Sequence, residues 1–126
     1  MSLKSPLGRV LGLGSAKSGT EHWWSQRLTA IAMVPLSLWF VVQMFGMSSF
    51  DYNAARAFVA APVNAILLLL LTFTLLYHSM LGTQVVVEDY VRGARKVVML
   101  VVLRFAYIAL GVAAIFSILK ISLGTA

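Results

Sequence analysis

The stretch from Tyr77 to Lys96 holds the side chains of this sequence that are best suited to chemistry. It starts within a long apolar run with His78 and ends with Asp89, Tyr90 and a cluster of basic residues. An ionisable residue inside a membrane-length apolar segment is costly and is by default a functional hypothesis. A neutral imidazole at such a depth is a good ligand for haem iron. The alternative is an interhelical hydrogen bond from His78, and the pattern alone leaves both interpretations open.

The helical repeat places His78 and Asp89 on one face. A rise of 1.5 Å per residue separates them by about 16 Å along the axis, and about 100° per residue brings them to within roughly 20° of each other. Thr74 and Gly82 stand one turn to either side of His78 and share its face. The glycine leaves room there for a flat ligand such as a porphyrin. Because the other histidine, His22, lies at the membrane boundary, a second axial ligand would come from a partner chain.

Asp89 and Tyr90 stand where the apolar segment gives way to polar residues. A tyrosine hydroxyl can donate a hydrogen bond to a carbonyl oxygen, and a neighbouring carboxylate can orient it or pass a proton. These are the requirements for reducing a quinone head group. The alternative is an ordinary helix end, with an aromatic residue at the membrane boundary and a solvated acid.

Arg27 and Arg104 complete the set of candidate residues. Arg27 begins the first apolar segment, where it can pair with carboxylates such as haem propionates or act as a positive anchor at the membrane surface. Arg104 lies within the third apolar segment, about 12 Å along a helix from Lys96. At that depth we expect it to face a propionate, Asp89 or another chain. Tyr107, one turn further on, shares its face.

The composition is that of a membrane protein rather than a soluble domain. Of the 126 residues, 60% are hydrophobic and 11% are charged, against about 25% charged in soluble domains. The net charge of +6 does not indicate nucleic acid, because the basic residues lie between apolar segments, and we predict no nucleic-acid partner. The chain has no cysteine and so supplies no disulfide, thiolate metal site or iron–sulfur ligand. Its first residues do not have the pattern of a signal peptide.

Hydropathy divides the chain into three spans, each near the roughly 20 residues that cross a lipid bilayer. We therefore predict an all-α membrane protein with three transmembrane helices, part of a multi-subunit helix bundle. The predicted spans are residues 28–47, 63–87 and 97–119. Pro35 is expected to kink the first span. Gly93 is expected to stand at the end of a helix.

Outside the spans, the sequence is more polar. Residues 1–26 are predicted to form an N-terminal segment with an interfacial end, in which residues 12–19 are loop. Polar connections are expected at residues 48–61 and 88–96. The predicted domains are thus the N-terminal segment 1–26, the anchor 27–120 and a short tail 121–126.

Lysine and arginine residues indicate the orientation, because they are enriched on the cytoplasmic side. Four lie in the N-terminal part through Arg27 and three in the 88–96 connection, against one in the 48–61 connection and one near the C-terminus. We therefore expect the N-terminus to be cytoplasmic and the C-terminus periplasmic. The expected location is a bacterial inner membrane, in preference to the mitochondrial inner membrane.

Together these residues make the chain resemble the hydrophobic membrane anchor subunit of succinate dehydrogenase (complex II), the small cytochrome b556-type subunit. The resemblance covers about residues 15–120. It rests on the stretch His22-Trp-Trp-Ser-Gln-Arg27-Leu-Thr-Ala before the first span. It rests still more on His78, followed after ten residues by Asp89 and Tyr90 at the end of the second span.

The resemblance implies a role for each candidate. His78 would be one axial ligand of the iron of haem b, with the second histidine supplied by a second cytochrome b membrane subunit. Tyr90, with Asp89 beside it, would bind ubiquinone. Arg27 would lie near the haem propionates and the quinone, and His22 is a further candidate for a propionate. The other implied partners are a flavoprotein and an iron–sulfur subunit on the cytoplasmic face.

The implied function is electron transfer from the iron–sulfur subunit to ubiquinone, in the tricarboxylic acid cycle and the respiratory chain. Succinate is oxidised on another subunit, so this chain itself is expected to carry no catalytic residue. One alternative is a fumarate reductase anchor, which works in the opposite direction; the direction depends on the quinone and the other subunits. The second alternative, from a different class, is a haem-free small membrane scaffold.

Overall fold

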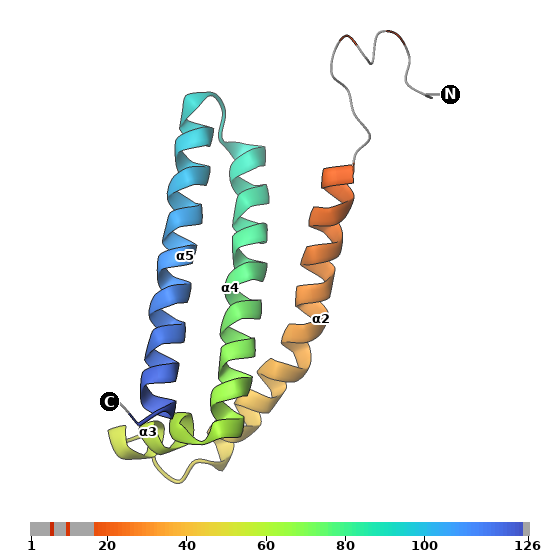
Figure 1. Cartoon of the computed structure of the whole chain (residues 1–126). Coiled ribbons are helices and arrows are strands. Elements are labelled where there is room, and N and C mark those ends of the chain that lie inside the picture. Colours follow the sequence, from red (N-terminus) through yellow and green to blue (C-terminus); the bar gives the residue numbers. More distant parts are fainter. Residues whose placement is uncertain (1–5, 7–9, 11–16, 125–126) are drawn as a thin grey trace.

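In the computed structural model, the residues that are described, 6, 10 and 17–124, are almost entirely helical and include no strand (Figure 1). The helices are α2 (Lys17–Gly46), α3 (Tyr52–Ala60), α4 (Pro62–Tyr90) and α5 (Ala94–Ser122). The prediction of an all-α fold is confirmed.

Three of these helices are long and apolar enough to cross a membrane. They are Gly19–Gly46, Pro62–Tyr90 and Ala94–Ser122, with mean hydropathies of 1.9, 1.9 and 2.4. A helix of 29 residues extends about 42 Å, which exceeds the ~30 Å of a hydrocarbon core. No residue of α5 is buried within the chain, and its exposed side chains are mostly apolar, as lipid or neighbouring helices require. The prediction of three helices that can span a membrane is therefore confirmed.

The helices extend beyond the predicted spans. Helix α2 already begins at Lys17, so the expectation of a loop through residue 19 is wrong for its last three residues; residues 12–16 lie outside the described part. Between α4 and α5 only residues 91–93 are not helical, where a connection of nine residues was expected. Hydropathy locates the apolar middle of a helix, but it does not detect polar turns that continue the helix past the hydrocarbon core.

The connection between the first two spans contains the short helix α3. It begins at the N-cap residue Asp51, whose Oδ1 accepts the backbone N–H of Ala54 at 2.8 Å. The side-chain amide of Asn64 donates to the carbonyl of Phe58 at 3.0 Å, which ties α4 to α3. The ring of Phe58 stacks on Trp39 of α2, with the centroids 6.1 Å apart. Helix α3 also packs against α5, so it contacts all three spans.

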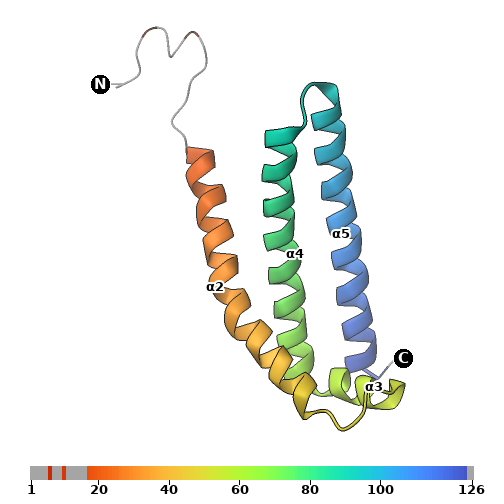
Figure 2. The same cartoon turned by 180° about the vertical axis from the view of Figure 1, so that it is seen from behind.

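Helix α4 lies between α2 and α5 and packs against both (Figures 1 and 2). The path of α2 bends in both views, and Pro35 lies inside this helix, in agreement with the expected kink. Helices α4 and α5 share a hydrogen bond of 2.9 Å between the hydroxyls of Thr83 and Tyr107. Tyr107 is the donor, because Thr83 donates its own proton to the carbonyl of Ser79 at 2.7 Å.

The turn between α4 and α5 depends on Gly93. Gly93 has a φ of 69° and a ψ of −154°, a backbone conformation that residues with a Cβ atom disfavour. It is also the N-cap residue of α5. Gly93 therefore stands at the start of α5, whereas α4 already ends at Tyr90 with Val91 as its C-cap, so the expectation of a helix end at Gly93 is wrong.

Asp51→Ala is expected to loosen α3, whereas Asp51→Asn, which retains an acceptor oxygen, should preserve most of the cap. The Ala54 amide and the Ser49 hydroxyl hold the pKa of Asp51 below its usual value. Because the folded-state pKa is lowered, the cap is fully present above about pH 4 and is lost as the pH falls through the folded-state pKa. Hydrogen exchange of the α3 amides at neutral pH should be fastest in Asp51→Ala. Equal exchange in both variants and the wild type would contradict this role.

Candidate functional site

His78 lies at the interface between α4 and α2, with its imidazole half-buried. Its Nδ1 is 2.9 Å from Oγ1 of Thr29, and its Nε2 is 3.4 Å from Nε2 of Gln26. Both partners come from α2, one turn apart on the same face. His78 stands about 18 Å along α4 from Tyr90, the last residue of that helix. A polar contact between two spans therefore forms deep within the membrane segment.

The hydroxyl of Thr29 determines which nitrogen of His78 carries a proton. Its oxygen is 2.8 Å from the carbonyl oxygen of Ser25 and 3.0 Å from that of Gln26, and a hydroxyl has one proton to donate. With that proton on a backbone carbonyl, Thr29 accepts the Nδ1–H of His78. A neutral His78 then has its lone pair at Nε2, where it accepts from the Gln26 amide. This lone pair is what a metal ion requires of a histidine ligand.

Two polar side-chain atoms of α2, Oε1 of Gln26 and Nε2 of His22, are shielded from solvent without a hydrogen-bond partner in the described residues. They belong to residues one turn apart on one face of the helix. The amide of Gln26 packs over Gly82, where an added Cβ would lie 3.6 Å from its Nε2. Buried polar atoms nearly always form a hydrogen bond. These two atoms can therefore still bond to water or to a polar group of a ligand.

An open groove of about 400 Å³ adjoins His78 along α2. Its other lining residues repeat every three or four positions and so form one face of the helix. They are Ala30, Met33, Val34, Ser37 and Leu38. This mostly apolar face suits the edge of a flat ligand or a helix of another membrane subunit.

Arg27 and His22 lie in different environments. Arg27 is exposed, and its guanidinium carbon is 5.2 Å from the centroid of the Trp23 ring, a cation–π contact. Trp23 meets Trp24 edge to face, with the centroids 5.2 Å apart, and both rings are exposed. This exposed cluster suits the membrane boundary, whereas Nε2 of His22 is shielded. The two residues therefore do not form one binding site within this chain.

Asp89 and Tyr90 lie in the last turn of α4, and both side chains are exposed, Tyr90 by 84%. Neither side chain makes a hydrogen bond with the other residues that the structure describes. The chain alone does not enclose a ligand at this end, so the walls of any site there belong to other subunits. His78, in contrast, faces α2.

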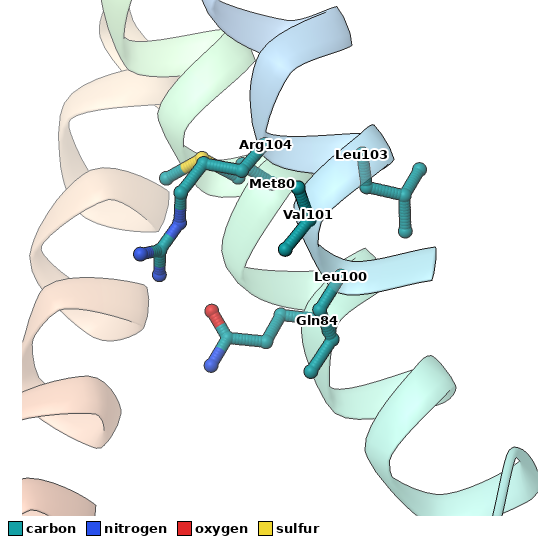
Figure 3. Close-up of a pocket in the computed structure, with 6 residues that line it drawn as sticks. All are labelled: Met80, Gln84, Leu100, Val101, Leu103 and Arg104. Carbon is teal, nitrogen blue, oxygen red and sulfur yellow. The ribbon is translucent and has the colours of Figure 1, made fainter. Parts of the chain in front are cut away.

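Arg104 is exposed on α5, beside a groove that it shares with Met80 and Gln84 of α4 (Figure 3). Of the three partners expected for it, Asp89 is not in contact, because no carboxylate in residues 17–124 forms an ion pair with Arg104. Tyr107, which shares its helix face, is instead bonded to α4.

Comparison with known proteins decides the family. Residues 1–119 match the family described as succinate dehydrogenase/fumarate reductase transmembrane subunit. The chain belongs to this family. The succinate dehydrogenase hydrophobic membrane anchor subunit of Rickettsia bellii is 42% identical over 88 residues, 70% of each chain. The corresponding subunit of Paracoccus denitrificans is 27% identical over 123 residues, which cover 95% of this chain and 93% of the relative.

This membrane anchor subunit is thus a multi-pass membrane protein of succinate dehydrogenase, and the expectation drawn from the resemblance is confirmed at this level. Among its described residues, no three His, Cys, Asp or Glu side chains gather in a way that could hold a metal ion. A metal held through His78 would therefore take its remaining ligands from a cofactor or another chain.

The sequence analysis did not identify Gln26 and Thr29 as partners of His78. Both occur in the stretch that carries the family resemblance, but no role was assigned to them. The available signal was their spacing: two polar residues stand one turn apart at the start of an otherwise apolar span. On a helix this places both on one face, where they need a polar partner from another helix.

Thr29→Val is expected to destabilise the anchor subunit, because it leaves Nδ1–H of His78 without an acceptor. The expected cost is roughly 1–3 kcal/mol in the free energy of unfolding, measured in mixed detergent and sodium dodecyl sulfate micelles. Thr29→Ser keeps the hydroxyl and should be close to the wild type.

The matched control for this experiment is Thr74→Val. Thr74 is also buried, but its hydroxyl donates only to the carbonyl of Leu70 in its own helix, at 2.7 Å. Its loss should therefore cost less than the loss of the Thr29 hydroxyl. Equal costs for the two valine variants would contradict a special role for the bond between Thr29 and His78.

Proposed function

We propose that this anchor subunit passes electrons from the iron–sulfur subunit of succinate dehydrogenase to ubiquinone, in the tricarboxylic acid cycle and the respiratory chain. Its own contributions are one axial ligand of haem b, His78, and part of the ubiquinone site, Tyr90 with Asp89. The observation that carries the proposal is the His78 imidazole, held at Nδ1 by Thr29 inside a membrane span so that Nε2 keeps its lone pair. Succinate oxidation belongs to another subunit.

The residues around His78 fit haem b. Nε2 is the ligating atom, and Gln26 must turn away to release it, which breaks one long contact of 3.4 Å. Thr29 would keep the ring in place as the acceptor for Nδ1–H, which leaves Nε2 available as a ligand. The apolar groove beside His78 would hold the apolar edge of the haem, and a second histidine ligand would come from the other cytochrome b membrane subunit. When bound, haem b supplies a one-electron carrier within the membrane.

Two basic groups of α2 are available for the haem propionates. The shielded Nε2 of His22, which lacks a partner in the part of the chain described, can donate to a propionate that reaches the interface of α2 and α4. Arg27 is exposed, so it can pair only with a propionate or quinone that lies at the boundary with another subunit. The two side chains would therefore serve different acceptors.

Tyr90 and Asp89 supply hydrogen bonds and protons at the ubiquinone site. The Tyr90 hydroxyl donates to a carbonyl oxygen of the quinone and so stabilises the negative charge that develops on it during reduction. Asp89 orients this hydroxyl and takes up protons from the aqueous side. Their exposure at the end of α4 is the reason that the iron–sulfur subunit and the second membrane subunit must complete the site.

The proposed location is a bacterial inner membrane with the N-terminus cytoplasmic and the C-terminus periplasmic. Three spans place the two ends on opposite sides, and Arg92, Arg95 and Lys96 lie at the same end of the helices as Lys17. The positive-inside tendency makes that end cytoplasmic. The flavoprotein and the iron–sulfur subunit dock there, near Asp89 and Tyr90.

The family to which the chain belongs also includes transmembrane subunits of fumarate reductase, so a fumarate reductase anchor is the second candidate function. The residues proposed to hold haem and quinone would be the same, and only the direction of electron flow would differ.

His78→Leu is expected to abolish the low-spin b-type signal in the reduced-minus-oxidised spectrum of the purified complex, because one iron ligand is lost. His22→Gln should keep that signal, since His22 is placed near a propionate and not on the iron. A wild-type complex without a b-type signal would show that the haem-free scaffold is the correct description.

Tyr90→Phe is expected to lower the rate of ubiquinone reduction by succinate about tenfold, the effect of losing a hydrogen bond worth about 1.4 kcal/mol. Succinate oxidation with an artificial acceptor, which bypasses the membrane site, should not change. The matched control is Tyr52→Phe, an exposed tyrosine at the start of α3, on the opposite side of the membrane. An equal loss of both activities in Tyr90→Phe would count against Tyr90 as a quinone ligand.

A further inference from the structure

Arg104 is a permanent charge inside a membrane span, and no anionic side chain among the described residues pairs with it. It lies ten residues after Ala94, the first residue of α5, which is about 15 Å along the helix. With the roughly 42 Å of α5 centred on a ~30 Å hydrocarbon core, the Cα of Arg104 lies about 9 Å inside that core. Arginine does not lose its proton, and no carboxylate of residues 17–124 pairs with it. The compensating anion therefore comes from outside the chain.

The charge stands at one end of a groove between α4 and α5, which we call the polar groove. It has a volume of about 190 Å³ and is lined by Met80, Gln84, Leu100, Val101, Leu103 and Arg104. Figure 3 shows the guanidinium of Arg104 and the carboxamide of Gln84 projecting from the two helices to the same side. Gln84 in turn donates to Oε1 of Glu88 at 2.9 Å, one turn closer to the end of α4. Polar groups therefore lead from Arg104 to the membrane surface.

A second groove continues toward the opposite end of the helices, and we call it the apolar groove. Its volume is about 230 Å³, it shares Met80 with the polar groove, and its walls include Leu76, Ile108 and Val112. Gly111 also lines it and contributes no side chain that would fill it. The two grooves thus form one track, with a cationic end near the surface and an apolar body that runs into the hydrocarbon core.

We propose that this track binds one anionic phospholipid, with the phosphate at Arg104 and Gln84 and an acyl chain along the apolar groove. A phosphate carries the full negative charge that Arg104 needs, and the planar guanidinium can bind two phosphate oxygens at once. The apolar groove leads away from the surface, which is the direction in which an acyl chain runs from its headgroup.

Two other occupants would account for only part of the track. A carboxylate from another membrane subunit would neutralise Arg104 but has no use for the apolar groove. A neutral quinone would fill the apolar groove without neutralising Arg104. A phospholipid satisfies both grooves, and the proposal does not depend on the roles proposed for His78 and Tyr90.

The test uses the whole complex, purified in mild detergent, with bound lipids counted by native mass spectrometry. The wild type should retain an anionic phospholipid that Arg104→Gln loses. Arg104→Lys keeps the charge and should retain part of the lipid. The matched control is Arg95→Gln, which removes the same charge from the exposed first turn of α5 and should leave the lipid count unchanged.

A second measurement separates a lipid headgroup from free phosphate. In phosphatidylcholine nanodiscs, added phosphatidylglycerol should raise the Tm of the wild type and of Arg95→Gln. Arg104→Gln should respond only at concentrations about tenfold higher, because this variant loses the charge-assisted hydrogen bonds to the lipid phosphate. Inorganic phosphate should not replace the lipid, because it has no acyl chain for the apolar groove.

The proposal is overturned if the wild-type complex carries no anionic phospholipid or if inorganic phosphate raises the Tm equally well. It is also overturned if Arg104→Gln keeps the lipid and releases the second membrane subunit or ubiquinone instead. Where Arg104→Gln does not assemble, the comparison of the wild type with Arg104→Lys and Arg95→Gln decides. A lipid count that falls equally in those two variants would then refute a specific site.

Discussion

The hydrocarbon core of a membrane offers no hydrogen-bond partners, so most polar side chains within these spans find theirs in the protein. This chain does so in two ways. Thr74 and Ser117 return their protons to carbonyls of their own helices, both at 2.7 Å. His78 with Thr29, and Thr83 with Tyr107, join α4 to its two neighbours. Since lipid removes most of the hydrophobic drive between helices, such bonds and close packing hold α2 and α5 against α4.

The sequence was sufficient to predict the number of spans and the presence of His78 within one of them, because both depend only on composition along the chain. Which faces of the helices meet could not be predicted in this way. Lipid is as apolar as a packed interface, so Leu75 on the outside and Leu81 on the inside give the same signal. The contact between Thr29 and His78 depends on the register of two helices and joins residues 49 apart. The short helix α3, which begins at the N-cap residue Asp51, was not predicted, because hydropathy identifies only the apolar stretches.

The sequence indicates the candidate residues, but it does not show how far this chain encloses them. Nearly all of Tyr90 is exposed, Arg27 rests only on a neighbouring tryptophan, and the groove beside His78 is open on one side. A single chain therefore provides one wall of each proposed site. This agrees with an anchor subunit that works within a complex, because a redox centre placed between subunits can receive electrons from one and deliver them to a ligand held by another.

His78 and Arg104 are both polar groups within spans, yet they are satisfied differently, and the reason is their protonation. An imidazole can remain neutral, so a hydroxyl and an amide from α2 are sufficient, and His78 can face inward between two helices. A guanidinium remains charged at every physiological pH, and neutral hydrogen-bond partners do not cancel its charge. Because this part of the chain offers no carboxylate at that depth, Arg104 must face outward, where an external anion can reach it. His78 thus points toward the neutral groups of α2, whereas Arg104 points outward because it requires an anion.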